Sequence, residues 1–252
     1  MTYKCYAICS TGNVRTDNQD NLYINGVYRQ DISNNSVFRH RAFSEDNALV
    51  AVADGMGGGK YGERASLEAV KALDNVEKST EGILRYLNKR NDVICALMDG
   101  NGRIGTTFAG LYINEKNVEI INIGDSRIYR FADGELSQLS RDHTVAQQMV
   151  DFGVMDKAEV ADHPEKHKLT QHLGIFPSEF IIEPFTTQID AYINDVFLLC
   201  SDGLTDMLDD TEIESVLNQP GDVEKWAELL YEEATQNGGK DNITILLLQV
   251  IY

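Results

Sequence analysis

The sequence predicts an α+β fold built on antiparallel sheets. Three observations indicate this class: strand-like apolar runs stand at both ends of the chain, a long helical stretch is inserted at 62–98, and strands do not alternate with helices as they would in parallel βαβ units. The chain has 252 residues, which suits one large domain or two small ones. We find neither an internal repeat nor a low-complexity linker that would divide it.

The first elements are short strands around a polar turn. Tyr3–Ser10 and Leu22–Ile24 are predicted strands. Residues 29–47 are polar, and we expect a surface excursion there. Leu49–Ala53 is a continuous apolar run with β-branched residues, which predicts a buried strand.

The stretch from 62 to 98 has the spacing of amphipathic helices. Its apolar residues recur three and four positions apart, as in Ala65, Ala69 and Leu73. A polar break near Ser79 and Thr80 divides the stretch into two predicted helices. Either hydroxyl side chain suits the N-cap of the second helix.

After position 105 the pattern returns to strands separated by turn signals. The predicted strands are Thr106–Asn114, Val118–Ile123 and Arg127–Phe131. Asn114-Glu115-Lys116-Asn117 and Asp133-Gly134 are typical of hairpin turns.

The last third begins with a polar segment and ends with a strand. Residues 142–178 contain four of the five histidines and predict short helices with loops. Val196–Cys200 predicts a second buried strand, Val223–Ala234 an amphipathic helix, and Ile243–Ile251 an apolar closing strand.

Composition and charge exclude some classes of partner. The formal net charge of −18 argues against binding of bare nucleic acid or of an anionic membrane surface. No apolar run is long enough to span a bilayer, and the N-terminus lacks the features of a secretory signal, so a cytoplasmic protein is expected. The four cysteines are scattered, which predicts reduced, buried thiols: Cys5, Cys9, Cys95 and Cys200.

Aspartates recur at the ends of the predicted buried strands. There are five of them: Asp20, Asp54, Asp125, Asp202 and Asp241. Each one alone is compatible with an ordinary turn. Five carboxylates at the rim of one core would be unfavourable without compensating cations, and divalent ions such as Mg²⁺ and Mn²⁺ prefer oxygen ligands. The pattern therefore favours a site with two cations, suited to in-line displacement at phosphorus.

Arg15 lies five residues before Asp20. A guanidinium beside a metal cluster can hold phosphate oxygens with two hydrogen bonds, whereas a surface salt bridge is the alternative.

The glycines after Asp54 also fit a dinucleotide fingerprint, Gly57-x-Gly59-x-x-Gly62. That site needs a parallel βαβ unit, which the sequence does not predict, and Asp54 would place negative charge near the pyrophosphate. We expect Gly57–Gly59 instead to turn the chain tightly into the next helix. A calcium-stabilised structural domain is another alternative, but no DxDxDG loop supports it.

Taken in order, these motifs resemble the metal-dependent, type 2C (PPM) family of serine/threonine protein phosphatases, and most closely its bacterial branch. The matching stretches span nearly the whole chain: GNVRTDNQD (12–20), VADGMGGG (52–59), GTT (105–107), NIGDSRIYR (122–130), SRDHT (140–144), HPEKHKLTQHLG (163–174), LLCSDGLTD (198–206) and GGKDNIT (238–244).

The resemblance implies that residues 1–252 form a single catalytic domain. Its centre would be an antiparallel β-sandwich flanked by helices in four layers, α-β-β-α, with a dinuclear metal cleft at one end. A flap subdomain would lie beside the cleft at about 142–178.

The resemblance also implies a role for each candidate residue. Asp54 would bridge two Mn²⁺ or Mg²⁺ ions, and Arg15 would bind the substrate phosphate; these are the two implied catalytic residues. The other implied metal ligands are Asp20, the carbonyl of Gly55, Asp202 and Asp241, with Asp125 holding a third, weaker ion.

The implied reaction is hydrolysis of phosphoserine and phosphothreonine in proteins by a metal-bridging hydroxide. Phosphorylated proteins are then the expected partners, together with a Ser/Thr kinase that shares them. Gln19 stands where many relatives have Glu, which motivates the alternative of a weakly active pseudophosphatase or phosphoprotein-binding module. Met56 replaces the histidine that eukaryotic relatives use as a proposed general acid, so metal-bound water is the expected proton donor, with His143 or His163 as candidate assistants.

Overall fold

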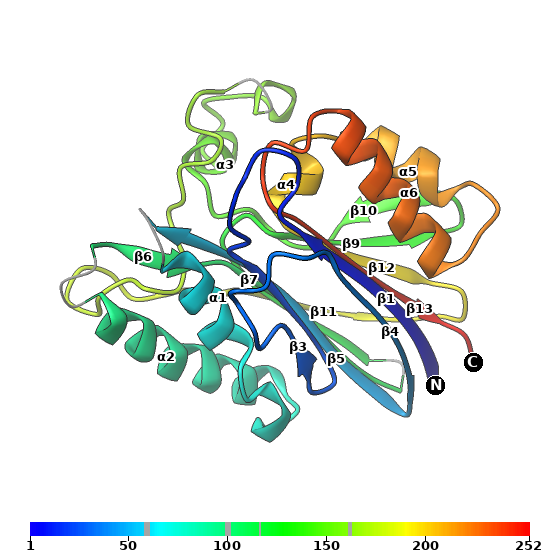
Figure 1. Ribbon diagram of the computed structural model, residues 1–252, viewed down its shortest axis with the longest axis horizontal. Helices are drawn as coiled ribbons and strands as arrows, with labels where there is room; N and C mark the ends of the chain where they lie inside the picture. Colours follow the sequence, from blue (N-terminus) through cyan, green and yellow to red (C-terminus); the bar gives the residue numbers. More distant parts are fainter. Residues whose placement is uncertain (58–60, 99–101, 116, 161–162) are drawn as a thin grey trace.

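The computed structural model describes residues 1–57, 61–98, 102–115, 117–160 and 163–252 (Figure 1). Two antiparallel sheets pack face to face, and helices cover the outer face of each sheet. This arrangement gives the four layers α-β-β-α and confirms the predicted fold class.

The elements can be assigned to the layers from their pairing. The first sheet runs in the order β10 (Glu135–Gln138), β9 (Arg127–Ala132), β12 (Val196–Cys200), β13 (Ile243–Val250), β1 (Thr2–Ser10) and β4 (Phe38–Glu45). The second runs in the order β11 (Phe185–Asp190), β8 (Asn117–Ile123), β7 (Phe108–Asn114), β5 (Asn47–Gly57), β2 (Asp20–Ile24) and β3 (Val27–Tyr28), with β6 (Ile104–Thr106) paired to the end of β5. The helices are α1 (Gly62–Val70), α2 (Thr80–Leu97), α3 (Val145–Asp151), α4 (Asp202–Thr205), α5 (Asp210–Leu217) and α6 (Val223–Gln236), with short 3₁₀ turns at Leu73–Asn75 and Lys157–Glu159.

Both faces of the central strands are covered. In β5, Leu49 and Ala51 pack against α1 and α2, whereas Val50 and Val52 pack against the first sheet. A strand buried on both faces has no polar side, which explains the unbroken apolar run of β5 before Asp54. β13 is also buried on both faces. One face packs against the second sheet, and the other lies under α4, α5 and α6.

The predicted helix boundary and turns are present. Ser79 is the N-cap of α2, and its hydroxyl accepts a hydrogen bond of 3.1 Å from the Gly82 N–H. Asp133 and Gly134 both have positive φ values, 53° and 86°, as a two-residue hairpin turn requires. The β7–β8 hairpin also closes where expected, at the pair Asn114 and Asn117, although position 116 lies outside the described residues.

The prediction of a surface excursion over 29–47 is wrong for residues 38–45. These residues form β4, which pairs with β1 at the edge of the first sheet. Exposed and partly buried residues alternate along β4, because one face packs on the sandwich and the other meets solvent. The exposed face carries Arg39 and Arg41, whose polarity concealed the strand.

The strand containing Asp54 is longer than predicted. β5 continues through Asp54 to Gly57, where it pairs with β6. Asp54 therefore lies inside a strand rather than after one. The predicted strand 106–114 is in turn divided at Thr107 into β6 and β7. The tight turn expected at Gly57–Gly59 stays a prediction, because positions 58 and 59 lie outside the described residues.

Candidate metal centre

The five predicted aspartates come from both sheets and meet at one end of the sandwich. Asp20 begins β2, and Asp54 lies opposite it in β5. Asp125 follows β8, Asp202 follows β12, and Asp241 precedes β13. Four of these side chains line a cleft of about 590 Å³, and Asp20, only 1% exposed, is the buried member of the group.

The carboxyl groups disfavour one another's ionisation. Burial raises the pKa of Asp54 well above its usual value, and the nearby charges of Asp20 and Asp202 raise it further. Burial and the charge of Asp202 have the same effect on the pKa of Asp125. Burial also raises the pKa of Asp20, to about 7, although hydrogen bonds from two hydroxyls oppose the shift. A cluster of this kind needs cations to remain ionised near neutral pH.

The ligand atoms fit hard divalent cations. Oδ2 of Asp20 accepts hydrogen bonds of 2.7 Å from Ser201 Oγ and from Thr244 Oγ1. Its Oδ1 and the Oδ1 of Asp202 are both buried and, within the described part of the chain, have no hydrogen-bond partner. Buried oxygens are rarely left in this state without a ligand. Carboxylate oxygens are the donors that Mg²⁺ and Mn²⁺ prefer.

Two threonines hold the backbone of Asp54 in place. The Asp54 N–H donates to Thr107 Oγ1 over 2.9 Å. Its carbonyl accepts from the Thr107 N–H over 2.9 Å and from Thr106 Oγ1 over 2.8 Å. The Thr107 hydroxyl also shares a hydrogen bond of 2.6 Å with Ser126 Oγ, next to Asp125. Sequence reasoning recognised the GTT motif but missed this function.

Gly55 is required by packing as well as by its proposed carbonyl contact. A Cβ atom at this position would lie 2.1 Å from the Gly62 carbonyl oxygen and 2.7 Å from that of Gln19. The absent side chain therefore lets the start of α1 approach β5. The Gly55 N–H donates to the same Gln19 carbonyl over 3.1 Å, which fixes the residue before Asp20.

Asn242 joins the loop between β1 and β2 to the start of β13 beside the cleft, and it was not predicted as a site residue. It is 5% exposed. Its Oδ1 accepts from the Gln19 N–H over 2.8 Å, and its Nδ2 donates to the carbonyls of Thr11 and Asp17 over 3.2 and 3.0 Å. These contacts fix the loop that carries Arg15 against the start of β13.

Arg15 lies at the mouth of the cleft. Its Nη2 is 2.6 Å from Oδ2 of Asp241, and its side chain is 57% exposed. The hydrogen bond to Asp241 raises the pKa of Arg15 above its usual value. A charged, exposed guanidinium beside the aspartates can exchange its contact with Asp241 for one with an anion in the cleft.

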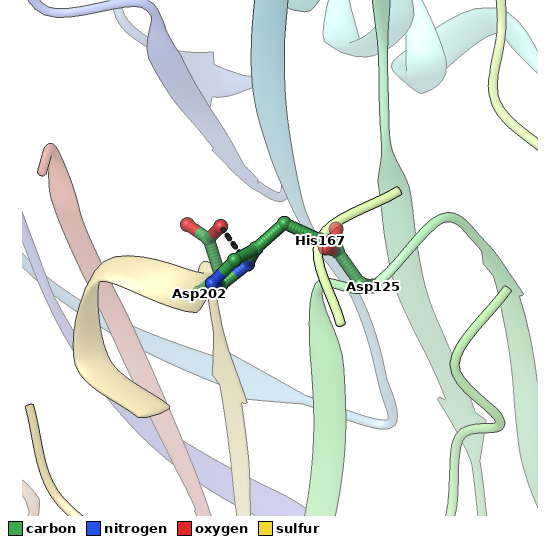
Figure 2. A group of neighbouring side chains, drawn as sticks. All are labelled: Asp125, His167 and Asp202. Atoms are coloured by element: carbon green, nitrogen blue, oxygen red, sulfur yellow. Dashed lines mark ion pairs between the residues drawn. The ribbon is translucent and has the colours of Figure 1, made fainter. Parts of the chain in front are cut away.

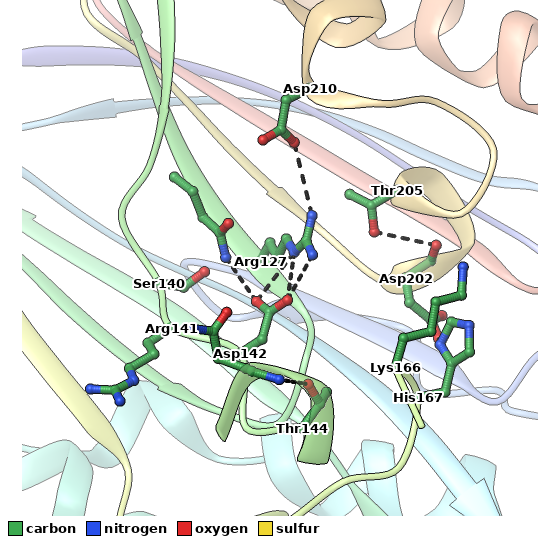
Figure 3. A network of polar contacts seen from close by, with 12 residues as sticks. Arg127, Ser140, Arg141, Asp142, Thr144, Lys166, His167, Asp202, Thr205 and Asp210 are labelled. Carbon is green, nitrogen blue, oxygen red and sulfur yellow. Dashed lines mark hydrogen bonds and ion pairs between the residues drawn. The ribbon is translucent and has the colours of Figure 1, made fainter. Parts of the chain in front are cut away.

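A second polar network is centred on Arg127, two residues after Asp125 in the sequence (Figure 3). The Arg127 guanidinium donates to both oxygens of Asp142, with its shortest contact of 2.7 Å from Nη2 to Oδ2. Asp142 is 8% exposed and also accepts from Gln138 over 2.8 Å. This ion pair fixes β9 to the segment that follows β10.

His143 and His163, the two histidines named from sequence, lie outside the lining of the cleft, and two other histidines are part of it. His143 Nδ1 accepts from the Gly124 N–H over 3.1 Å, burial lowers its pKa, and His163 Nδ1 accepts from the Glu165 N–H over 3.2 Å. Among the described residues that line the cleft are His167 and His172 instead, together with Met56. Figure 2 shows His167 between Asp125 and Asp202.

Comparison with known proteins shows the family of the chain. Residues 23–246 match the family described as "Protein phosphatase 2C". The chain belongs to the protein phosphatase 2C family. The alternative of a phosphoprotein-binding module without activity receives no support, since the relatives reported below are named phosphatases.

This protein phosphatase 2C chain is similar to named bacterial enzymes over most of its length. It is 34% identical over 230 residues to the serine/threonine phosphatase stp of Listeria monocytogenes, a match that covers 86% of this chain and 88% of the relative. It is 30% identical over 256 residues to the protein phosphatase PhpP of Streptococcus pneumoniae, with 96% of each covered.

Solved structures of the family share the fold. The serine/threonine phosphatase PstP/Ppp of Mycobacterium tuberculosis superposes with a TM-score of 0.82 at 30% identity, with all of both chains covered. A catalytic domain of PstP in complex with two manganese ions gives a TM-score of 0.78 at 30% identity, again with full coverage of both chains.

Two further sequence-based expectations concern the whole phosphatase chain. The four cysteines are free and buried, as predicted. Within the described residues, the structure contains no helix with both the length and the apolar character needed to cross a membrane.

Proposed function

We propose that this chain hydrolyses phosphoserine and phosphothreonine monoesters of proteins at the cleft where the five aspartates meet. The observation that carries the proposal is their convergence, from two sheets, at one end of the sandwich, where Oδ1 of Asp20 and Oδ1 of Asp202 have no hydrogen-bond partner among the described residues. Family membership supports the same activity.

The proposed cofactors are two Mn²⁺ or Mg²⁺ ions, with a third bound more weakly. Asp54 would contact both principal ions. The remaining ligands would be Asp20, the Gly55 carbonyl, Asp202 and Asp241, and Asp125 for the third ion. When bound, such ions lower the pKa of a shared water and so make hydroxide available near neutral pH. The manganese complex of PstP supports this choice of metal.

Arg15 would orient the substrate. Its guanidinium is exposed at the mouth of the cleft and can hold two phosphate oxygens in the plane of its fork. In that position it also balances the negative charge on the phosphoryl oxygens during attack. Met56 lines the same cleft but has no proton to give, so the proposal leaves protonation of the leaving oxygen to water.

The proposal includes a flap at about 142–178 in this single catalytic domain. α3 projects from the sandwich on the side of α4 (Figure 1), and His167 and His172 from this segment line the cleft. The flap would contact the protein part of a substrate. Phosphorylated proteins, and a Ser/Thr kinase that acts on the same proteins, are the proposed partners. A cytoplasmic location is proposed because the four cysteines are free and buried, as is usual in a reducing compartment.

The decisive experiment replaces the bridging carboxylate. We expect Asp54→Asn to lower Mn²⁺-dependent phosphate release from a phosphothreonine peptide by at least roughly 100-fold, the scale seen when a charge-stabilising group is lost from an active site. Asp133→Asn is the matched control, because Asn tolerates the positive φ of that hairpin turn and the turn is not part of the cleft lining. Unchanged hydrolysis by the Asp54 variant would overturn the proposal.

A further inference from the structure

His167 lies where two cavities meet. The cleft and a second cavity of about 590 Å³ beside α4 and α5 share three lining residues, Asp125, His167 and Asp202. His167 belongs to the segment proposed as a flap, whereas the two aspartates follow strands of different sheets. Figure 2 shows the imidazole beside the Asp202 carboxylate, with Asp125 near the other end of the His167 side chain.

The three side chains have the spacing of a cation site. One ligand atom from each lies within 4.8 Å of the others. His167 Nδ1 is 3.6 Å from Oδ2 of Asp202. Ligands that bind a common transition-metal ion at about 2.0–2.2 Å are separated by roughly 3 to 4.4 Å, so small side-chain movements would bring all three into contact with one ion.

A fourth residue orients the imidazole for this role. The other ring nitrogen, Nε2, lies 3.3 Å from Oδ2 of Asp206. A proton on Nε2 faces that carboxylate, which leaves the lone pair of Nδ1 directed at Asp202. A carboxylate behind the second nitrogen is the usual partner of a metal-binding histidine. Asp206 is itself fixed by Lys166, whose Nζ lies 3.3 Å from Oδ1.

We propose that His167 supplies a nitrogen ligand to the third cation site, together with Asp125 and Asp202. The inference rests on the proposed function, which places a weaker ion at Asp125, and adds a ligand to that ion. Mg²⁺ prefers oxygen ligands, whereas imidazole suits transition metals. The third site therefore selects Mn²⁺ over Mg²⁺, while the two all-oxygen sites accept either ion.

The test measures bound metal without substrate. Metal-free protein is titrated with Mn²⁺, and pulsed electron paramagnetic resonance detects coupling of bound Mn²⁺ to ¹⁴N. All other proposed ligands are oxygen, so directly coupled nitrogen reports on this site alone. We expect the coupling in the parent protein, its loss in His167→Asn, and its retention in His172→Asn. His172 lines the same cleft, but its Nδ1 contacts the Leu173 carbonyl over 2.9 Å.

Two further measurements sharpen the result. Asp206→Asn should keep the coupling but weaken binding of the third Mn²⁺ by roughly 10- to 100-fold, the effect of losing a carboxylate behind a metal-binding histidine. Excess Mg²⁺ should displace Mn²⁺ from the other sites and leave the nitrogen-coupled ion in place.

The metal-binding test of His167 and the activity test of Asp54 can fail independently of each other. Parent protein without nitrogen coupling, or a His167→Asn variant that retains it, would overturn the assignment of His167. Either result would leave the Asp54 experiment unaffected. Conversely, nitrogen-coupled Mn²⁺ in a protein that releases no phosphate would support the site and contradict the proposed activity. His167 is about half exposed, and thermal unfolding without metal should confirm that its variant folds.

Discussion

Asp20 and Asp54 stand directly opposite each other on the antiparallel strands β2 and β5. Like charges in such a pair destabilise a sheet, and here one of the two carboxyl groups is fully buried. The arrangement makes the stability of the metal-free protein depend on pH.

We expect metal-free protein to be more stable at pH 5 than at pH 8. The folded pKa of Asp20 is raised to about 7 from the usual 3.8, so protonated Asp20 favours the folded state. This contribution is complete below about pH 4 and is lost as the pH rises through about 7, at roughly 1.4 kcal/mol for each unit of pKa difference. Chemical unfolding in the presence of a chelator measures the trend.

Asp20→Asn is the control for this dependence. Its metal-free stability should vary less between pH 5 and pH 8 than that of the parent. With Mn²⁺ present, the trend in the parent should reverse, because cations bind the deprotonated carboxylates. Equal stability of the metal-free parent at both pH values would contradict the prediction.

Gly55→Ala should destabilise the protein and weaken its binding of metal. The new Cβ would overlap the Gly62 carbonyl oxygen at 2.1 Å, so either α1 or β5 must move. Overpacking of this kind costs about 1–3 kcal/mol, measured by urea unfolding. Gly153→Ala is the control variant, because a Cβ atom at this position would have no other atom within 4 Å. Only the positive φ of 67° is unfavourable for alanine, and it should cost about 1–2 kcal/mol of stability. Metal affinity should fall in the first variant only.

Asn242→Ala should release the loop that carries Arg15. Three backbone groups would lose their partner: the Gln19 N–H and the carbonyls of Thr11 and Asp17. Each unsatisfied group costs about 1–3 kcal/mol where it stays buried, so we expect a loss of several kcal/mol in the free energy of unfolding. Asn88→Ala, at an exposed position of α2, should change it by less than about 0.5 kcal/mol. Similar values for the two variants would show that Asn242 does not hold the loop.

Arg15→Ala should raise the KM for a phosphopeptide by roughly 10- to 100-fold, the equivalent of losing about 1.5–3 kcal/mol of hydrogen bonding to a charged group. Arg15→Lys should restore only part of the loss, because an ammonium cannot bind two phosphate oxygens in one plane. Steady-state kinetics with saturating Mn²⁺ would measure both variants. Arg85→Ala removes an exposed ion pair with Glu77 and should leave KM unchanged. An Arg15→Ala enzyme with the parent's KM would exclude phosphate binding by this residue.

Elements buried on both faces could be predicted from sequence, whereas edge elements could not. β12 and the part of β5 before Asp54 are continuous apolar runs, and β13 is apolar along most of its length, a pattern that favours buried strands. β4 and β11 lie at sheet edges, where partly buried and exposed residues alternate. The exposed face of β4 carries arginine, so its composition indicated a surface excursion, whereas no element was predicted for the residues of β11. Period-two alternation was the signal that could have identified them.

Some residues of the candidate site could likewise be predicted from sequence, and others could not. The aspartates were predictable because each stands beside an apolar strand or glycine in an ordered motif. Thr107, Asn242 and His167 were not, because their roles depend on contacts with segments distant in the sequence. α5 is a different case: Asp209 and Glu212 form a capping box that local sequence alone could have revealed.

The origin of the carboxylates in two different sheets has a mechanical consequence. Asp20 and Asp54 belong to the second sheet, whereas Asp202 and Asp241 are attached to strands of the first. Cations held by both pairs would resist sliding of one layer over the other at the catalytic end of the sandwich. Amide hydrogens at that end should then exchange more slowly with solvent when metal is bound, while those at the opposite end change little.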